Sequence, residues 1–216
     1  MATQRVPMSN VPNTPNELDL QVPHGLLGMP RYLRISGNAL SYSGGKWVGS
    51  KSYEWLLSEV AGVRFGHQLL VFYRYKFGNS YTVELRHQSG EVLRIRMYSF
   101  DAAEDDEDWD RYEQILAALE QPVFERLEEH ALRSIGAGET VLLAGVAVNH
   151  RGLSWAVDQQ LSWADCDLLQ TPHSFTLNSR QNSRLFTTIS YQREWNAGVL
   201  LSVIQALLKK QSASYC

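Results

Sequence analysis

Several stretches of this 216-residue chain approach the patterns of phosphate, calcium or zinc sites, but each lacks a residue that the chemistry requires. In SGGKWVGS, residues 43–50, Trp47 stands where a phosphate-binding loop needs Ser or Thr after its lysine. In the acidic stretch that starts at Asp106, Arg111 stands where a calcium loop needs glycine. The six histidines form no i, i+4 pair and no cluster with cysteine, as zinc would require. We therefore expect a protein that is not an enzyme and holds no metal, no cofactor and no small-molecule substrate.

Cationic side chains form the first group of candidate binding residues. Because the side chains of a strand point alternately to its two faces, three successive β-type segments between residues 69 and 99 each place their cations on one side. If these segments are neighbours in a sheet, one face carries five cations and a single carboxylate, Glu84. The five are Arg74, Lys76, Arg86, Arg94 and Arg96. An acidic partner suits such a face, but a solvated sheet face that discourages strand aggregation has the same pattern.

A glycine-hinged loop provides the second group. Trp47 lies between Lys46 and Lys51 in this loop. An indole flanked by ammonium groups suits the interface of an anionic membrane. The alternative is that Trp47 folds back and covers the end of the β-structure.

These two groups lead to two functional interpretations. The favoured one is a non-catalytic scaffold or adaptor that recognises an acidic segment of a protein partner, or inhibits that partner. The alternative is a peripheral membrane-targeting module that binds anionic lipid headgroups. Residues 31–100 contain ten Lys and Arg against four Glu, so an acidic partner should meet this half. The overall pI near 6.1 argues against a nucleic-acid partner.

The spacing of the turn residues between strand-like runs predicts two β-rich modules of an α+β protein. Five of the seven prolines lie in the first thirty residues, which show no apolar period and are expected to form an extended or disordered arm. β-type runs separated by turn residues follow, with Gly66 and Gly78 predicted to lie in turns. Each series ends in a helix that begins near Trp109 or Trp195, and we expect these tryptophans to anchor the two helices in the core. The predicted boundaries are 1–30 for the arm, 31–121 for the first module, 122–138 for a helical linker and 139–216 for the second module.

The order of these elements resembles the pleckstrin-homology-like superfold, in its bacterial form and in tandem. The tripeptide Leu-Ser-Trp occurs at 153–155 and 161–163, and the first module is expected to match the second with Leu40 at Leu153 and Val60 at Cys166. The resemblance implies two partly open antiparallel β-barrels, each closed by a C-terminal helix. The second module shows only about five strand-like runs. Two cysteines give no disulfide framework, and the longest apolar run, 141–148, is too short to span a bilayer, so we expect a cytoplasmic protein.

Overall fold

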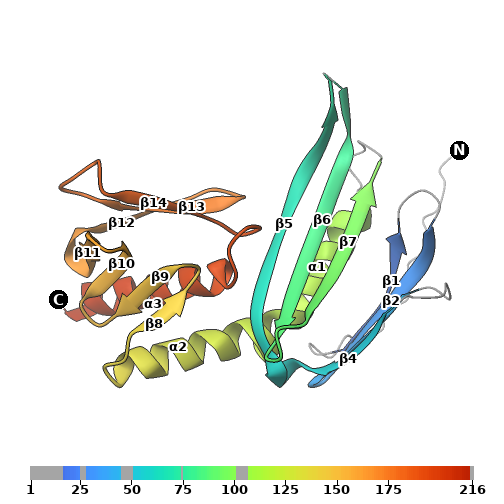
Figure 1. The fold of residues 1–216 in the computed structure, drawn as a ribbon, viewed down its shortest axis with the longest axis horizontal. Helices are drawn as coiled ribbons and strands as arrows, with labels where there is room; N and C mark the ends of the chain where they lie inside the picture. Colours follow the sequence, from blue (N-terminus) through green and yellow to red (C-terminus); the bar gives the residue numbers. More distant parts are fainter. Residues whose placement is uncertain (1–16, 25–27, 45–50, 74, 101–106, 215–216) are drawn as a thin grey trace, which may run out of the picture.

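A computed structural model describes residues 17–24, 28–44, 51–73, 75–100 and 107–214 of the chain. The described part is mainly β, with 51% of its residues in strands, and has a few helices, as the predicted α+β class requires. The strands form four antiparallel sheets (Figure 1), and none of the four closes into a barrel within the described residues. The two barrels that the resemblance implies therefore remain a prediction.

The first half consists of a four-stranded sheet, a short 3-10 turn, a three-stranded sheet and a helix. The first sheet contains β1 (Glu17–His24), β2 (Gly28–Ser36), β3 (Ala39–Ser43) and β4 (Ser52–Leu56). The turn η1 (Leu57–Glu59) leads to β5 (Val60–Phe72), β6 (Tyr75–His87) and β7 (Val92–Ser99). Helix α1 (Glu107–Leu119) follows and continues through a π-helical turn, η2 (Glu120–Glu125), into α2 (Arg126–Gly136).

The second half has the same order of elements. Its four-stranded sheet contains β8 (Val141–Leu143), β9 (Val146–Asn149), β10 (Gly152–Ala156) and β11 (Gln159–Ser162). The turn η3 (Trp163–Asp165) leads to β12 (Cys166–Gln170), β13 (Ser174–Ser179) and β14 (Phe186–Ser190), and α3 (Ala197–Ser214) ends the series. The expectation of about five strands is wrong, because two of the expected strands are divided. The run 141–149 is split into β8 and β9 at Ala144 and Gly145, which both have a positive φ, and η3 splits the run 160–169 into β11 and β12.

Equivalent residues begin the two three-stranded sheets. Val60 and Cys166 are the first residues after the 3-10 turns, and both are fully buried. Leu40 and Leu153 are each the second residue of the third strand in their four-stranded sheets, and both are buried. The two correspondences expected from the sequence therefore hold in the order of the elements.

The backbone contacts at the two 3-10 turns repeat as well. Gln88 N donates a hydrogen bond to Glu59 O at 2.9 Å, and Arg180 N donates one to Asp165 O at the same distance. Glu59 and Asp165 are the last residues of η1 and η3. A contact that recurs at the same point of both halves supports an internal duplication.

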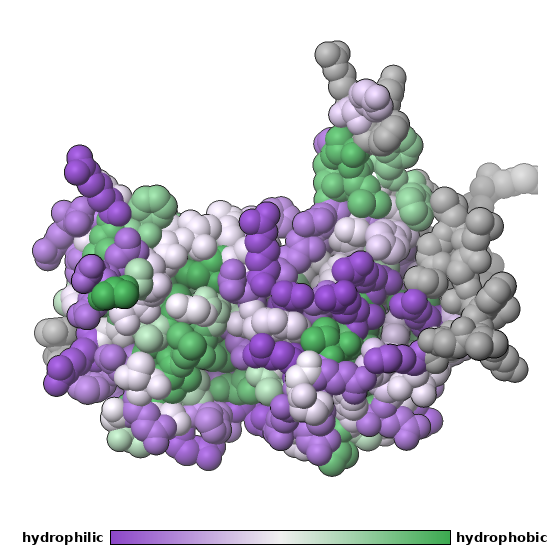
Figure 2. Space-filling model, viewed as in Figure 1, coloured by the Kyte–Doolittle hydropathy of each residue, from purple (hydrophilic) through white to green (hydrophobic). Residues whose placement is uncertain are grey.

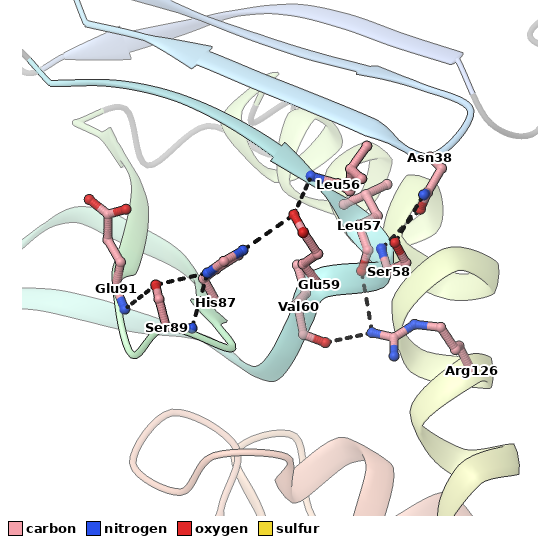
Figure 3. Close-up of polar contacts among 10 residues, drawn as sticks. All are labelled: Asn38, Leu56, Leu57, Ser58, Glu59, Val60, His87, Ser89, Glu91 and Arg126. Atoms are coloured by element: carbon pink, nitrogen blue, oxygen red, sulfur yellow. Dashed lines mark hydrogen bonds and ion pairs between the residues drawn. The ribbon is translucent and has the colours of Figure 1, made fainter.

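The side chains of these two turn residues also contact equivalent strand residues, but the partner is a histidine in the first half and a serine in the second. Glu59 Oε2 lies 3.3 Å from His87 Nε2 (Figure 3), and Asp165 Oδ2 accepts a hydrogen bond from Ser179 Oγ at 2.5 Å. His87 and Ser179 are the strand partners of Val60 and Cys166. In the first half only, Arg126 of α2 also donates to the carbonyl oxygens at both ends of η1.

Three further expectations are wrong. The arm predicted for 1–30 contains β1 and the start of β2, which pair in register from Glu17 with Ser36 onwards; Leu18 and Val22 face the core from β1. Gly66 and Gly78 lie inside long strands rather than in turns, because the hairpin between β5 and β6 turns near Tyr73. The segment 69–77 is consequently the end of a hairpin and not a strand of its own.

Candidate functional site

The predicted basic face is the outer face of the β5–β6–β7 sheet. The inner face is apolar, with Tyr81, Val83 and Leu85 of β6 all at most 2% exposed. On the outer face the strand register places Glu84 directly between Arg64 of β5 and Arg94 of β7. The expected alternation of side chains therefore holds along this part of β6 and β7.

A buried carboxylate organises the arginines of this face. Glu84 is only 4% exposed. Its Oε2 lies 2.5 Å from Arg64 Nη2, and its Oε1 lies 2.9 Å from Arg94 Nε and 3.9 Å from Arg96 Nη2. Charge-assisted contacts of this kind fix the orientation of a planar guanidinium group. Three cations share one anion, so the cluster keeps a net positive charge.

Arg94 and Arg96 are the members of this cluster that face solvent. Their side chains are 55% and 48% exposed, whereas that of Arg64 is 24% exposed. A cavity of about 310 Å³ lies beside Arg96, and its lining also includes Arg64, Glu84 and Arg193. This part of the face can receive an anionic group from outside the chain.

Arg86 is not available in the way that the sequence suggested. Two guanidinium groups pack over the ring of Trp195, with Arg64 Cζ 4.4 Å and Arg86 Cζ 4.8 Å from the ring centroid. Gly62 of β5 makes room for this arrangement, because an added Cβ would come within 3.1 to 3.3 Å of Arg86 and Trp195. Trp195 therefore occupies part of the basic face instead of beginning the closing helix as expected.

The segment 191–196 carries Trp195 onto the first half. Asn196 N donates to Val63 O at 2.7 Å, and Asn196 Oδ1 accepts from Val63 N at 2.9 Å. Phe65 N donates to Tyr191 O at 3.2 Å. Gly66 allows Gln192 to approach, since a Cβ there would lie 2.9 Å from Gln192 Cβ. The segment is a loop (Figure 1) that covers part of the free edge of β5 through these backbone contacts.

Two predicted cations of the basic face do not join this cluster. Lys76 is exposed, and the register places it six residues from Thr82, which pairs with Arg96. Six residues of strand span about 20 Å. Arg74 lies outside the described residues. The expected face of five cations is therefore reduced to Arg94 and Arg96, with Arg64 as a partner that the sequence analysis missed.

The glycine-hinged loop is described only at its end. Lys46 and Trp47 lie outside the described residues. Lys51 is exposed, and its Nζ lies 3.8 Å from Glu91 Oε1. An exposed pair at this distance contributes little stability.

A cleft of about 770 Å³ separates the two halves above the segment 191–196, and two histidines from different halves meet in it. The rings of His67 on β5 and His173 before β13 have centroids 4.7 Å apart. Partial burial, and then the charge of His173, hold the pKa of His67 below its usual value. His67 also contacts Trp109, which is 37% exposed and does not anchor α1 in the core as expected; Tyr112 and Ile115 do so.

Two observations concern thiol and metal chemistry in the part of the chain that the structure describes. Cys166 is buried, and burial raises the pKa of its thiol to about 11, so that the thiol is protonated at neutral pH. The described residues contain no group of three or more His, Cys, Asp or Glu side chains that could hold a metal. Among them, no helix has the length and apolar character needed to cross a bilayer.

Comparisons of the chain with protein-family models, with curated proteins and with solved structures found no match.

Proposed function

We propose that the chain is a non-catalytic binding protein whose first half captures an acidic segment of a partner protein, acting as an adaptor for that partner or as its inhibitor. The observation that carries the proposal is the pair of exposed arginines, Arg94 and Arg96, held in place by the buried Glu84. A pre-oriented guanidinium group loses less freedom when it binds a carboxylate. Such binding is electrostatic, so it should weaken as salt increases.

We also propose that each half is a pleckstrin-homology-like module. Support comes from the order of elements, since each half has seven strands in a four-plus-three arrangement, a 3-10 turn between them and a closing helix. Strand β1 lies beside β7, and α1 contacts both, which is the neighbourhood that a partly open barrel with a helix at one end would need. A fold of this kind has many functions, so the argument for binding remains with the arginines.

The proposal is tested by the affinity of a fluorescently labelled oligoglutamate peptide for two double variants, measured by anisotropy at low and high salt. Replacing Arg94 and Arg96 by Gln should lower the affinity about tenfold or more, because both cations face the probe. Glutamine is chosen because a carboxylate at position 94 would meet the buried Glu84. Replacing Arg133 and Arg151, exposed arginines of α2 and of the β9–β10 turn, should leave the affinity unchanged.

Equal affinities of the two double variants would contradict the proposal. Pelleting with vesicles tests the membrane alternative in the same preparations. Binding to vesicles that contain anionic lipid, without binding of the peptide, would replace protein capture by membrane targeting.

A further inference from the structure

The free edge of strand β5 is paired along only part of its length. Val63 and Phe65 form backbone hydrogen bonds with the segment 191–196. Because successive residues of a strand direct their backbone groups to opposite sides, the N–H and C=O groups of His67 and Leu69 point to the same edge. Among the described residues, no hydrogen bond from another element reaches these groups.

The unpaired part of this edge borders a space that can hold an extended chain. The cleft of about 770 Å³ has Gly66, His67, Gln68 and Leu69 on its β5 side. Its other side is formed by the second half, including Pro172, His173 and Thr188. A strand added to a sheet lies about 4.8 Å from its neighbour, and it needs open space of this kind along the edge.

The side chains above the cleft are apolar and exposed. Strands β5 and β6 run past the end of β7, since β7 pairs only with Asn79–Arg86, and they project from the molecule as a two-stranded ribbon (Figure 1). Val71 on the ribbon is 57% exposed, and Leu69, at the last position that is still three strands wide, is 48% exposed. Figure 2 shows hydrophobic surface gathered on this ribbon. A two-stranded ribbon with exposed apolar residues is marginally stable by itself and gains from a further strand.

We propose that an extended segment of a partner protein adds to β5 beside His67 and Leu69, next to the part of the edge that the loop 191–196 already covers. Its apolar side chains would alternate with acidic or neutral polar ones. The alternation matches the pleat, and the acidic residues suit the end of the β5–β6 hairpin, because residues 65–83 contain Arg74 and Lys76 and no carboxylate. This surface goes beyond the capture at Arg94 and Arg96, which lie on β7 at the other side of the sheet.

A second copy of the chain is a less suitable occupant than a partner segment. Two β5 edges paired with each other would bring two ribbons of the same positive charge together. The chain itself supplies the precedent for a different segment on this edge, since residues 191–196 already form backbone hydrogen bonds there.

Hydrogen exchange measured by NMR tests the proposal on the unmodified chain. In the free protein the amides of His67 and Leu69 should exchange fast, whereas those of Gln68 and Leu70, which point to β6, should exchange slowly. The probe is a short synthetic peptide, blocked at both ends, in which Val alternates with Glu and Thr. Its addition should slow exchange at His67 and Leu69. If these two amides are protected in the free protein, or stay unprotected with the peptide at saturation, the proposal is wrong.

Two substitutions at one position separate strand pairing from side-chain contact. Leu69→Pro removes an N–H that the β5–β6 ladder does not use, a site at which edge strands tolerate proline. It should lower the affinity for the peptide about tenfold or more, whereas Leu69→Ala, which keeps the N–H, should lower it less. Equal losses would overturn the proposal. If Leu69→Pro does not fold, the hydrogen-exchange experiment alone tests the strand pairing.

The oligomeric state tests the second copy as the occupant. If light scattering shows a dimer and the amides of His67 and Leu69 are protected in it, the edge belongs to a second copy and the proposal is wrong.

Discussion

The two halves share one order of strands and helices, but equivalent positions carry charged residues in the first half and neutral residues in the second. Counted from the 3-10 turn, the fourth cross-strand pair is Arg64 with Glu84 in the first half and Leu169 with Thr176 in the second. The next strand continues each row, with Arg94 beside Glu84 and Thr188 beside Thr176. The charged row is absent from the second half, so the fold does not require it. A feature that the fold does not require is a better candidate for function than one that both halves share.

The lengths of the strands differ between the halves as well. Strands β5 and β6 have 13 residues each, whereas β12 and β13 have five and six. The extra length of β5 gives an edge on which the segment 191–196 lies, and a ribbon that projects beyond β7. The first half therefore carries the exposed edge of β5 and the projecting ribbon. The second half contacts this edge through residues 191–196.

The largest expected losses of stability test the buried residue that begins the 3-10 turn in each half. Leu57 and Trp163 are the first residues of η1 and η3, and they are 0% and 4% exposed. Leu57→Ala should lower the free energy of unfolding by about 2–5 kcal/mol and Trp163→Ala by about 3–5 kcal/mol, because each leaves a cavity in a core. Urea unfolding followed by circular dichroism measures both. A loss below about 1 kcal/mol at either position would contradict their equivalence as anchors.

The next effect concerns the joint between the halves. Asn196→Ala should lower the free energy of unfolding by about 2–4 kcal/mol, because it removes the side-chain bonds to Val63 N and Ala61 O and places alanine at a φ of 62°. Unfolding of the two halves should then separate into two transitions in calorimetry. Gln192→Ala, which loses an exposed bond to Gln68, is the matched control and should keep one transition. Identical curves for the two variants would show that Asn196 does not couple the halves.

Much of the order of elements could be predicted from the sequence, and the predictions that failed did so for physical reasons. Alternation of apolar residues along 80–87 and 91–99 is regular, so the inner face and the exposed Arg94 and Arg96 were predicted correctly. The turns assigned to Gly66 and Gly78 failed, because these glycines serve close approach instead: a Cβ on Gly78 would overlap Ser99 O. With β5 cut at Gly66, the pairing of Arg64 with Glu84 could not be found.

The contacts between the halves could not be predicted from local patterns. Trp195 precedes an apolar helix, and the sequence analysis treated it as part of the core. Its packing against Arg64 and Arg86 depends on a pairing of residues more than a hundred positions apart, which no periodicity records. Strand β1 was missed because Pro23 and nearby prolines dominate a segment whose alternation is short.

A smaller effect distinguishes the charged row from the neutral row. Glu84→Gln should lower the free energy of unfolding by about 1–3 kcal/mol, because it weakens charge-assisted bonds to Arg64 and Arg94 at a buried position. Thr176→Val removes the 2.9 Å hydrogen bond to Thr188 and should cost about 1 kcal/mol or less. Thermal unfolding compares them. If Thr176→Val is the more damaging substitution, the ionic cluster does not position its arginines as described.

The smallest effect is a dependence on pH at the cleft. The pKa of His67 is lowered by burial and by His173, so in acid the unfolded state takes up a proton that the folded state resists. Stability should therefore fall as the pH drops through about 6.5, the ordinary histidine pKa, towards the lower folded value. His67→Gln should make unfolding between pH 7 and 5 less dependent on pH. If the free energy of unfolding of His67→Gln depends on pH as steeply as that of the unchanged chain, or more steeply, the contact between His67 and His173 does not lower the pKa of His67.

The difference between the halves is tested most directly by two-dimensional NMR of the isotopically labelled chain during titration with the oligoglutamate peptide. The account predicts shifts at the backbone and guanidinium signals of Arg94 and Arg96, with smaller shifts at Arg64, and none at Leu169, Thr176 and Thr188. The shifts should disappear at high salt. Shifts centred on the second half, or no shifts at low salt, would contradict the claim that the first half carries the binding surface.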